Sequence, residues 1–230
     1  MAKRVLIINC DDFGQSRGIN DAVVEAHTKG ILTSASLMVR YDAALEAARI
    51  ANTYAQTLSV GLHIELGEWT MEGVPWYEVV PDVLNGGDLV SIDREIGAQI
   101  EKHRQLVGCN PTHLDSHQHI HQRPHILPIV QRYASQLNVP LRGVDPVIHS
   151  WGGTWGVHSQ QEAARAFRTA PKKPMIEMGC HPSREGTPHD QEVGYGNMRQ
   201  VELAFLCSPE AKQLVRTMGI TLRPMHRRFE

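Results

Sequence analysis

The chain has few of the features that mark membrane, secreted or disulfide-rich proteins. Only four of its 230 residues are cysteine, and no two of them form a C-x-x-C pair. Scattered cysteines of this kind favour free thiols in a cytoplasmic protein over a disulfide framework. No apolar run is long enough to cross a membrane, and the apolar run after Met1 is too short for a signal peptide. We therefore expect a cytoplasmic protein with no membrane partner.

A large excess of charge of either sign is also missing. Lys and Arg total 23 against 25 for Asp and Glu, which gives a formal net charge of -2 and argues against a basic, nucleic-acid-binding surface. With 41% hydrophobic residues, the chain has enough apolar side chains for an ordinary globular core. There is no internal repeat or linker, so we expect residues 1–230 to form a single domain. The sequence is compatible with a homodimer but does not set the oligomeric state.

What the chain does contain is a regular alternation of strand-type and helix-type patterns. The predicted strands cover residues 4–10, 31–39, 58–66, 112–116, 140–144, 174–180 and 220–222, and the predicted helices cover 18–29, 42–54, 92–107, 125–137, 160–168 and 209–218. Residues 67–90 are expected to form a long loop with a short helix near residues 77–84. The alternation predicts an α/β fold, a seven-stranded (β/α) barrel-like parallel sheet, with an open doubly wound sheet as the alternative.

Polar residues gather where these strands end. Asp12, His63 and His117 follow three different strands, and in a parallel sheet all such ends lie on one face. One carboxylate and two imidazoles leave positions open for water and substrate, which suits a catalytic divalent metal. Each group could instead only cap its own strand, but convergence of three makes the metal site the better interpretation.

A catalytic base is also needed, because a nearby group must accept the proton of a metal-activated water. Asp11 is the candidate. Successive strand residues point to opposite faces, so Asp11 and Asp12 both reach the site only if the strand bends there, as Gly14 permits. An Asp-rich turn without catalytic function is the alternative.

The segment from Thr112 to His125 carries five of the thirteen histidines. Not all of them can bind one metal. We therefore assign Asp115, His119 and His121 to substrate binding. The two histidines could instead support the metal ligands through hydrogen bonds. His181 follows the sixth strand. We expect it to be an acid that protonates a leaving group from the side opposite Asp11, and a strand-end histidine satisfied by the backbone is the alternative.

Aromatic residues fall in the loops beyond the strand ends. They are Trp69, Trp76, Tyr77, Trp151 and Trp155. Such side chains could stack on sugar rings or could simply pack the loops.

Four stretches, INCDDFGQSRGINDAVVEAHTKGILTSASLMV, VGLHIEL, PTHLDSHQHIH and IEMGCHPS, resemble the successive motifs of the YdjC-like carbohydrate deacetylases, which include the chitooligosaccharide deacetylases. The resemblance implies a barrel-like fold and hydrolysis of an N-acetyl group from an amino sugar. It also implies one divalent ion held by Asp12, His63 and His117, with Asp11 as base. Gln118 departs from the pattern, because related sequences often have another histidine there.

The resemblance implies magnesium, whereas two imidazole ligands favour zinc or another transition metal. Two further functions remain open at this point. One is metal-dependent phosphoester hydrolysis, in which His119 and His121 could supply a second metal site. The other is a non-catalytic sugar-binding protein, against which the adjacent Asp11 argues, because binding alone needs no base.

Overall fold

The computed structural model describes residues 4–154, 156–185, 190 and 197–225. The strands are β1 (Arg4–Phe13), β2 (Ser34–Leu37), β3 (Ser59–Ile64), β4 (Gly67–Trp69), β5 (Pro75–Glu78), β6 (Leu114–Ser116), β7 (His149–Trp151), β8 (Met175–Cys180) and β9 (Ile220–Leu222). The helices are α1 (Arg17–Lys29), α2 (Ala44–Thr53), α3 (Leu89–Val107), α4 (Leu127–Leu137), α5 (Gln160–Arg168), α7 (Met198–Cys207) and α8 (Pro209–Thr217), with 3-10 turns η1 (Val83–Asn85) and η2 (His117–Gln122).

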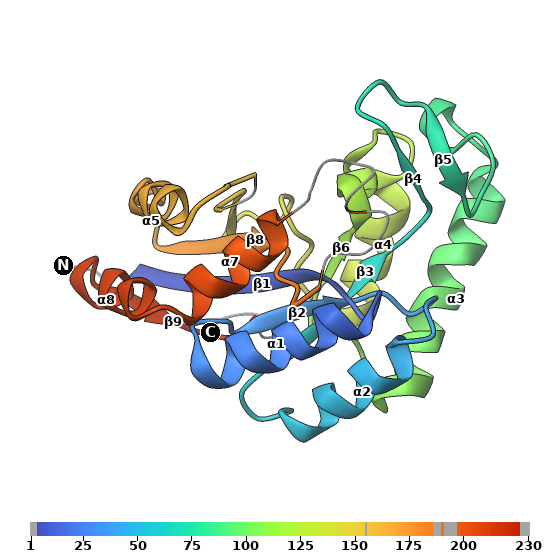
Figure 1. Cartoon of the computed structure of the whole chain (residues 1–230). Coiled ribbons are helices and arrows are strands. Elements are labelled where there is room, and N and C mark those ends of the chain that lie inside the picture. Colours follow the sequence, from blue (N-terminus) through green and yellow to red (C-terminus); the bar gives the residue numbers. More distant parts are fainter. Residues whose placement is uncertain (1–3, 155, 186–189, 191–196, 226–230) are drawn as a thin grey trace.

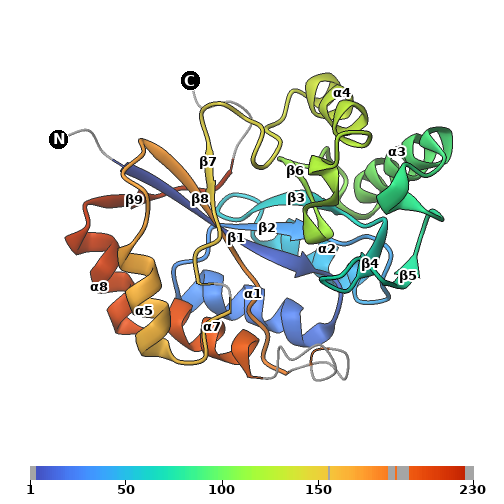
Figure 2. The ribbon, with the colours of Figure 1, turned by 90° about the horizontal axis from the view of Figure 1, so that it is seen from above.

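The main sheet is parallel and has seven strands, which confirms the predicted fold class. Six of them run in the order β6-β3-β2-β1-β8-β7, and β9 pairs with the first residues of β1. Figures 1 and 2 show the sheet curling, with α1 and α2 on its outer side and α5, α7 and α8 grouped around the strands next to β1. Because every strand runs the same way, the carboxyl ends of β1, β3, β6 and β8 open onto one end of the fold.

Local sequence signals account for the helix boundaries. Ser16 caps α1 by accepting a hydrogen bond from the backbone of Ile19, and Asp88 caps α3 in the same way. Gly108 ends α3 in the left-handed conformation. Ser208 caps α8 with a proline at its first position, as the sequence predicts.

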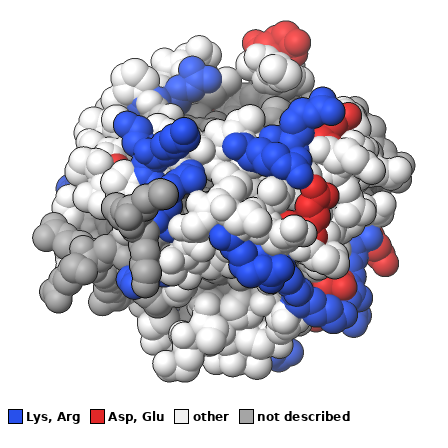
Figure 3. All heavy atoms as spheres, turned by 90° about the vertical axis from the view of Figure 1, so that its left-hand side faces the viewer, with Lys and Arg blue, Asp and Glu red and all other residues white. Residues whose placement is uncertain are grey.

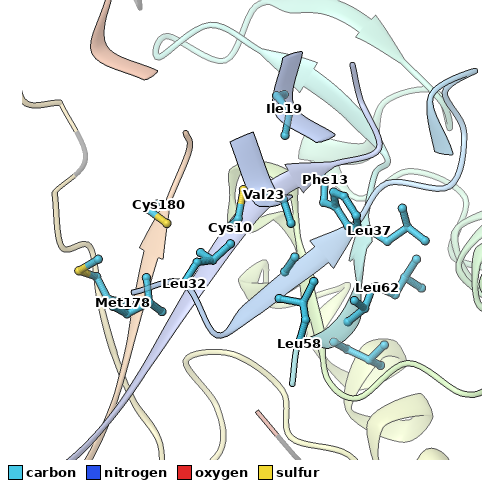
Figure 4. Packing of buried hydrophobic residues seen from close by; sticks show 14 of the residues in the cluster. Cys10, Phe13, Ile19, Val23, Leu32, Leu37, Leu58, Leu62, Met178 and Cys180 are labelled. Atoms are coloured by element: carbon cyan, nitrogen blue, oxygen red, sulfur yellow. The ribbon is translucent and has the colours of Figure 1, made fainter. Parts of the chain in front are cut away.

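The core lies between the outer helices and the sheet. Figure 4 shows side chains of α1, such as Ile19 and Val23, together with Cys10, Leu37 and Leu62 from β1, β2 and β3. All five side chains have no solvent exposure. This rigid interior fixes the strand ends that carry the polar residues.

Three parts of the secondary structure differ from the sequence prediction. Residues 140–144 do not form a regular strand. Pro140 has no N–H to donate, Gly143 has a φ of 69°, and the segment pairs with β6 only through a single bridge at Leu141. The expected long loop contains the antiparallel β4–β5 hairpin, and of the helix expected near residues 77–84 only the turn η1 at Val83–Asn85 forms. Helix α7 was not predicted.

The surface near the amino ends of the strands carries many charged side chains. Figure 3 shows Lys and Arg side chains spread over the face near α5 and α8, with fewer Asp and Glu among them. Within the described part of the chain, no helix combines the length and the apolar character needed to cross a bilayer.

Candidate active site

The site begins with a distortion at the end of β1. Asp12 has a φ of 61°, and the pairing of β1 with β2 shifts register between Cys10 and Phe13. A left-handed residue other than glycine is uncommon, and Asp is among those that adopt it more often. Gly14 follows at φ 90°, where a Cβ would lie 2.7 Å from Leu37 Cδ1 and 2.8 Å from Met38 O. The predicted bend is therefore present, and both aspartates line the same cavity.

Asp12, His63 and His117 meet at this bend, as the sequence predicts. Asp12 Oδ1 lies 3.5 Å from Nε2 of His63 and 3.3 Å from Nδ1 of His117. One ligand atom from each residue fits within a mutual distance of 4.8 Å. Asp12 Oδ1 is buried, and none of the described residues makes a hydrogen bond to it. A buried orphan oxygen facing two imidazole nitrogens is what a cation site requires, so these residues fit a divalent metal.

Arg199, from the unpredicted helix α7, holds the other oxygen of Asp12. Its Nη2 donates to Asp12 Oδ2 at 2.9 Å, and its Nε donates to Asp190 at 2.8 Å. Burial acts to raise the pKa of Asp12, but the Arg199 guanidinium together with His117 and His63 outweighs it and keeps that pKa well below its usual value. Asp12 is therefore ionised and has one oxygen, Oδ1, directed at the imidazoles.

Asp11 is held by a different arginine. The guanidinium of Arg142 donates to both oxygens of Asp11, at 2.6 and 2.7 Å, and also contacts Asp115 at 2.8 Å and Glu177 at 2.6 Å. Asn9 adds a bond of 2.9 Å to Asp11. Burial opposes ionisation of Asp11, yet the Arg142 charge lowers its pKa below the usual value. Asp11 is therefore an ionised, precisely oriented carboxylate.

Asp115, expected to bind substrate, lies behind the ring of His63. It is completely buried, and its oxygens accept hydrogen bonds from His63 Nδ1 at 2.8 Å and Ser36 at 2.6 Å. A carboxylate behind a ligand imidazole fixes the ring's orientation and tautomer. Arg142 also bonds Asp115, so the guanidinium already occupies the second cluster of potential metal ligands, Asp11, His63 and Asp115.

His63 and His117 lie in a strongly negative environment. Burial disfavours the charged imidazole, but Asp115 outweighs it and raises the pKa of His63 to about 10. For His117, the neighbouring carboxylates of Asp12 and Glu68 overcome burial and raise the pKa to about 9. The same negative field would favour a divalent cation, to which His63 and His117 would bind as neutral imidazoles.

The other histidines of the segment separate into two groups. His119 lines the cavity at φ 53°. His121 is fully buried, with Nδ1 at 2.6 Å from Ser116 Oγ and Nε2 at 3.0 Å from the backbone oxygen of Arg142. Burial lowers its pKa to about 4. His121 therefore supports the loop and the Arg142 backbone, which fits the second of its two expected roles, that of a supporting partner.

His181 lies beside Asp11, not opposite to it as expected. Strands β1 and β8 are hydrogen-bonded neighbours with Cys10 paired to Cys180, so the residues that follow are also adjacent. His181 Nε2 is 3.7 Å from Asp11 Oδ2, and its backbone N–H donates to Glu202. Its side chain is 27% exposed, so it faces the cavity.

The cavity above these residues has a volume of about 810 Å³. Asp11, Asp12, His63, His117 and His181 form its polar floor. Trp69, Trp76 and Trp151 line it together with Met71, so three of the five aromatic residues singled out from the sequence border the cavity. Tyr77 donates to or accepts from Tyr41 at 2.9 Å, and Trp155 lies outside the described residues.

The fold and this site define a barrel-like α/β protein with a converging cluster of metal-ligand type. The chain also matches the family model of the YdjC-like proteins over residues 5–217. It belongs to this family. The "Carbohydrate deacetylase" of Geobacillus stearothermophilus is 30% identical, over 95% of this chain and 96% of that protein. The "Chitooligosaccharide deacetylase" of Salmonella paratyphi C is 37% identical, over 94% and 96%.

Solved structures give the same fold. A protein described as a candidate cellobiose-phosphate cleavage protein from Enterococcus faecalis V583 superposes with a TM-score of 0.78 at 23% identity, covering 97% of this chain and 98% of that one. A family 4 carbohydrate esterase from Streptomyces lividans in complex with acetate has a TM-score of 0.59 at 12% identity, covering 96% and 93%. At these identities the likeness concerns the fold alone.

Proposed function

We propose that this chain is a metal-dependent hydrolase that removes an N-acetyl group from an amino sugar or a chitooligosaccharide. Family membership and the deacetylase names of its relatives support the reaction class. The single observation that carries the proposal is the meeting of Asp12, His63 and His117 around one orphan carboxylate oxygen, with Asp11 next in the chain.

We propose Asp12, His63 and His117 as the ligands of one divalent ion. When bound, such an ion would polarise the acetyl carbonyl and lower the pKa of a water. The resemblance to the deacetylase family favours magnesium. The donor set of two imidazoles and one carboxylate favours zinc or another transition metal, because magnesium prefers oxygen ligands.

Asp11 is the proposed base, and His181 the proposed acid. Asp11 accepts the proton of the attacking water, and Arg142 holds its carboxylate in one orientation while it does so. Amide cleavage then requires a proton on the departing amine, and His181 is the cavity-facing group next to Asp11. His119 and the tryptophans of the cavity supply the surface against which the sugar lies.

Two observations weigh against the other functions. A two-metal phosphoesterase needs a second set of free ligands, but Arg142 occupies Asp11 and Asp115, and both ring nitrogens of His121 are engaged. A protein that only binds sugar has no use for a second carboxylate beside the metal ligand.

The test is acetate release from N-acetylglucosamine and N,N′-diacetylchitobiose, by protein stripped of metal and then supplied with Mg²⁺ or Zn²⁺ in separate reactions. We expect release that depends on added metal. Hydrolysis of p-nitrophenyl phosphate without acetate release would favour the phosphoesterase, and sugar binding without either product would favour the binding protein.

We further propose that the protein works in the cytoplasm, in line with its four free cysteines, one of which, Cys109, is exposed. A homodimer is the assembly to test, and light scattering at micromolar concentration distinguishes it from a monomer.

A further inference from the structure

The β4–β5 hairpin reaches the ligand cluster through Glu68. This residue is 6% exposed and lines the cavity, and its Oε1 lies 3.5 Å from Nε2 of His117. That Nε2 atom is buried and makes no hydrogen bond among the described residues, and the Glu68 carboxylate is the charged group that faces it. On the other side of the same ring, Nδ1 lies 3.3 Å from Asp12 Oδ1. The imidazole of His117 is therefore placed between two carboxylates.

His63 shows the same arrangement with its nitrogens exchanged. Its Nε2 faces Asp12 Oδ1 at 3.5 Å, and its Nδ1 donates to Asp115 at 2.8 Å. In each ring, one nitrogen points at the shared oxygen of Asp12 and the other at an outer carboxylate. A carboxylate that accepts the outer N–H of an imidazole leaves the inner nitrogen unprotonated and fixes the ring for ligation.

A second contact fastens the hairpin to the loop that carries His117. The side-chain oxygen of Gln118 accepts from the backbone N–H of Trp69 at 2.9 Å, and its amide nitrogen donates to the Trp69 carbonyl at 2.7 Å. Gln118 follows His117 and Trp69 follows Glu68, so the two contacts join neighbouring residue pairs. Gln118 has a φ of 50°, a left-handed conformation that is costly for a residue other than glycine and persists only where surrounding contacts hold it.

We propose that Glu68 is a positioning residue that directs His117 to bind the metal through Nδ1. The two hydrogen bonds of Gln118 to the Trp69 backbone hold the hairpin, and with it Glu68, in place. The two histidines then ligate through different nitrogens, His63 through Nε2 and His117 through Nδ1. This inference rests on the metal site proposed above and adds a residue from outside the strand-end motifs to it.

The test is calorimetric titration of the metal-free protein with Zn²⁺ alone. Glu68→Ala removes the acceptor, and we expect the dissociation constant to rise about 10–100-fold, the usual effect of losing such a partner. Glu68→Gln keeps an acceptor oxygen without the charge, so its loss should be smaller. Gln118→Ala should weaken binding in the same direction, because the hairpin is no longer fastened.

Matched controls separate positioning from general damage. Glu65→Gln removes another buried carboxylate, one that lies 3.3 Å from Arg40 instead of a ligand ring. Gln122→Ala removes a second glutamine of the same loop that also lines the cavity. Both should bind Zn²⁺ like the wild type. Thermal unfolding of each metal-free variant shows whether it is folded. If Glu68→Ala is not folded, the zinc affinity of Glu68→Gln tests the proposal.

A spectroscopic readout tests the geometry itself. In long-range ¹H–¹⁵N spectra of the zinc-loaded protein, His117 should show a protonated Nε2 and a ligated Nδ1, with the reverse for His63. Ligation of His117 through Nε2, or wild-type zinc affinity in both Glu68 variants, would overturn the inference while leaving the proposed function intact. Failure of the wild type to bind about one ion would instead refute the metal site.

Discussion

Arg142 is the residue whose loss should most damage this fold. It is 5% exposed and its guanidinium bonds three carboxylates, those of Asp11, Asp115 and Glu177, at 2.6 to 2.8 Å. Arg142→Met keeps much of the side-chain volume but removes the charge. Three buried carboxylates would then be left without the cation they share.

The expected cost follows from that geometry. Removing one partner of a buried ion pair costs about 3–5 kcal/mol, because the remaining charge is left unpaired. With three carboxylates affected, we expect a loss at or above the upper end of that range near neutral pH. For a chain of this size each kcal/mol shifts the melting temperature by about 2–4 °C, so the drop should be at least about 10 °C.

The loss should also shrink in acid. Arg142 is the main lowering influence on the pKa of Asp11 and Asp115, against the opposing effect of burial. A depressed carboxyl pKa stabilises the fold above the unfolded pKa, and that stability is lost as the pH falls through the folded value. The difference between wild type and variant should therefore narrow as the pH falls below about 4, the pKa of an unfolded Asp.

Urea unfolding at several pH values measures the effect, with Arg168→Met as the matched control. Arg168 pairs with Glu210 at 2.7 Å, but the two side chains are 54% and 47% exposed, and such a surface pair contributes about 0–1 kcal/mol. If Arg142→Met cost no more than Arg168→Met, the argument that Arg142 neutralises a buried carboxylate cluster would be refuted.

The remaining predictions concern the site and one distant histidine. His63→Ala and His117→Ala should each lose the single divalent ion while keeping the fold; elemental analysis showing full occupancy would contradict this. Asp11→Asn should keep the metal and lower kcat by roughly 10²–10⁴-fold, the usual scale for loss of a general base, and steady-state kinetics on diacetylchitobiose check it. His181→Ala should retain the metal and lose far more turnover on an acetamide than on an activated ester, and equal losses would remove it from the acid role. Burial lowers the pKa of His103 to about 4, so the unfolded chain binds more protons between pH 6.5 and 4 and stability falls as the pH drops; the slope measured by urea unfolding should be smaller in His103→Gln.

The fold was predictable because apolar patterns and helix signals reflect local physics. The alternation of strand-type and helix-type runs predicted the parallel sheet, and Ser208 with Pro209 marked the start of α8 as it stands in the structure. The ligand cluster was predictable for a related reason: in a parallel sheet, the ends of separate strands share one face. Helix α7 was missed, although its apolar face is buried. The β4–β5 hairpin was missed because the sequence between these two strands has no strong turn signal.

The charged partners of the site could not be placed from sequence, because contacts between distant segments leave no local pattern. A signal was nevertheless present. The run PLRGV holds a single Arg142, and the run PMIEMGC holds a single Glu177, each among residues typical of a buried strand. A lone charge in such a run requires a partner of opposite sign. The structure joins these two at 2.6 Å and adds Asp11 and Asp115.

The correction to His181 changes how the proposed base and acid work together. Asp11 is only 4% exposed and is bonded by Arg142 and Asn9, so a proton accepted there has little access to solvent. Because Arg142 lowers the pKa of Asp11, Asp11 is a weak base and readily gives up a proton that it has accepted. His181 lies 3.7 Å away on the neighbouring strand, and its side chain is 27% exposed toward the cavity. If Asp11 and His181 have the proposed roles of base and acid, this contact gives the proton that Asp11 takes from water a route to His181 and from there to the departing amine. Two groups on opposite sides of the substrate could not share one proton in this way, whereas two groups on paired strands can.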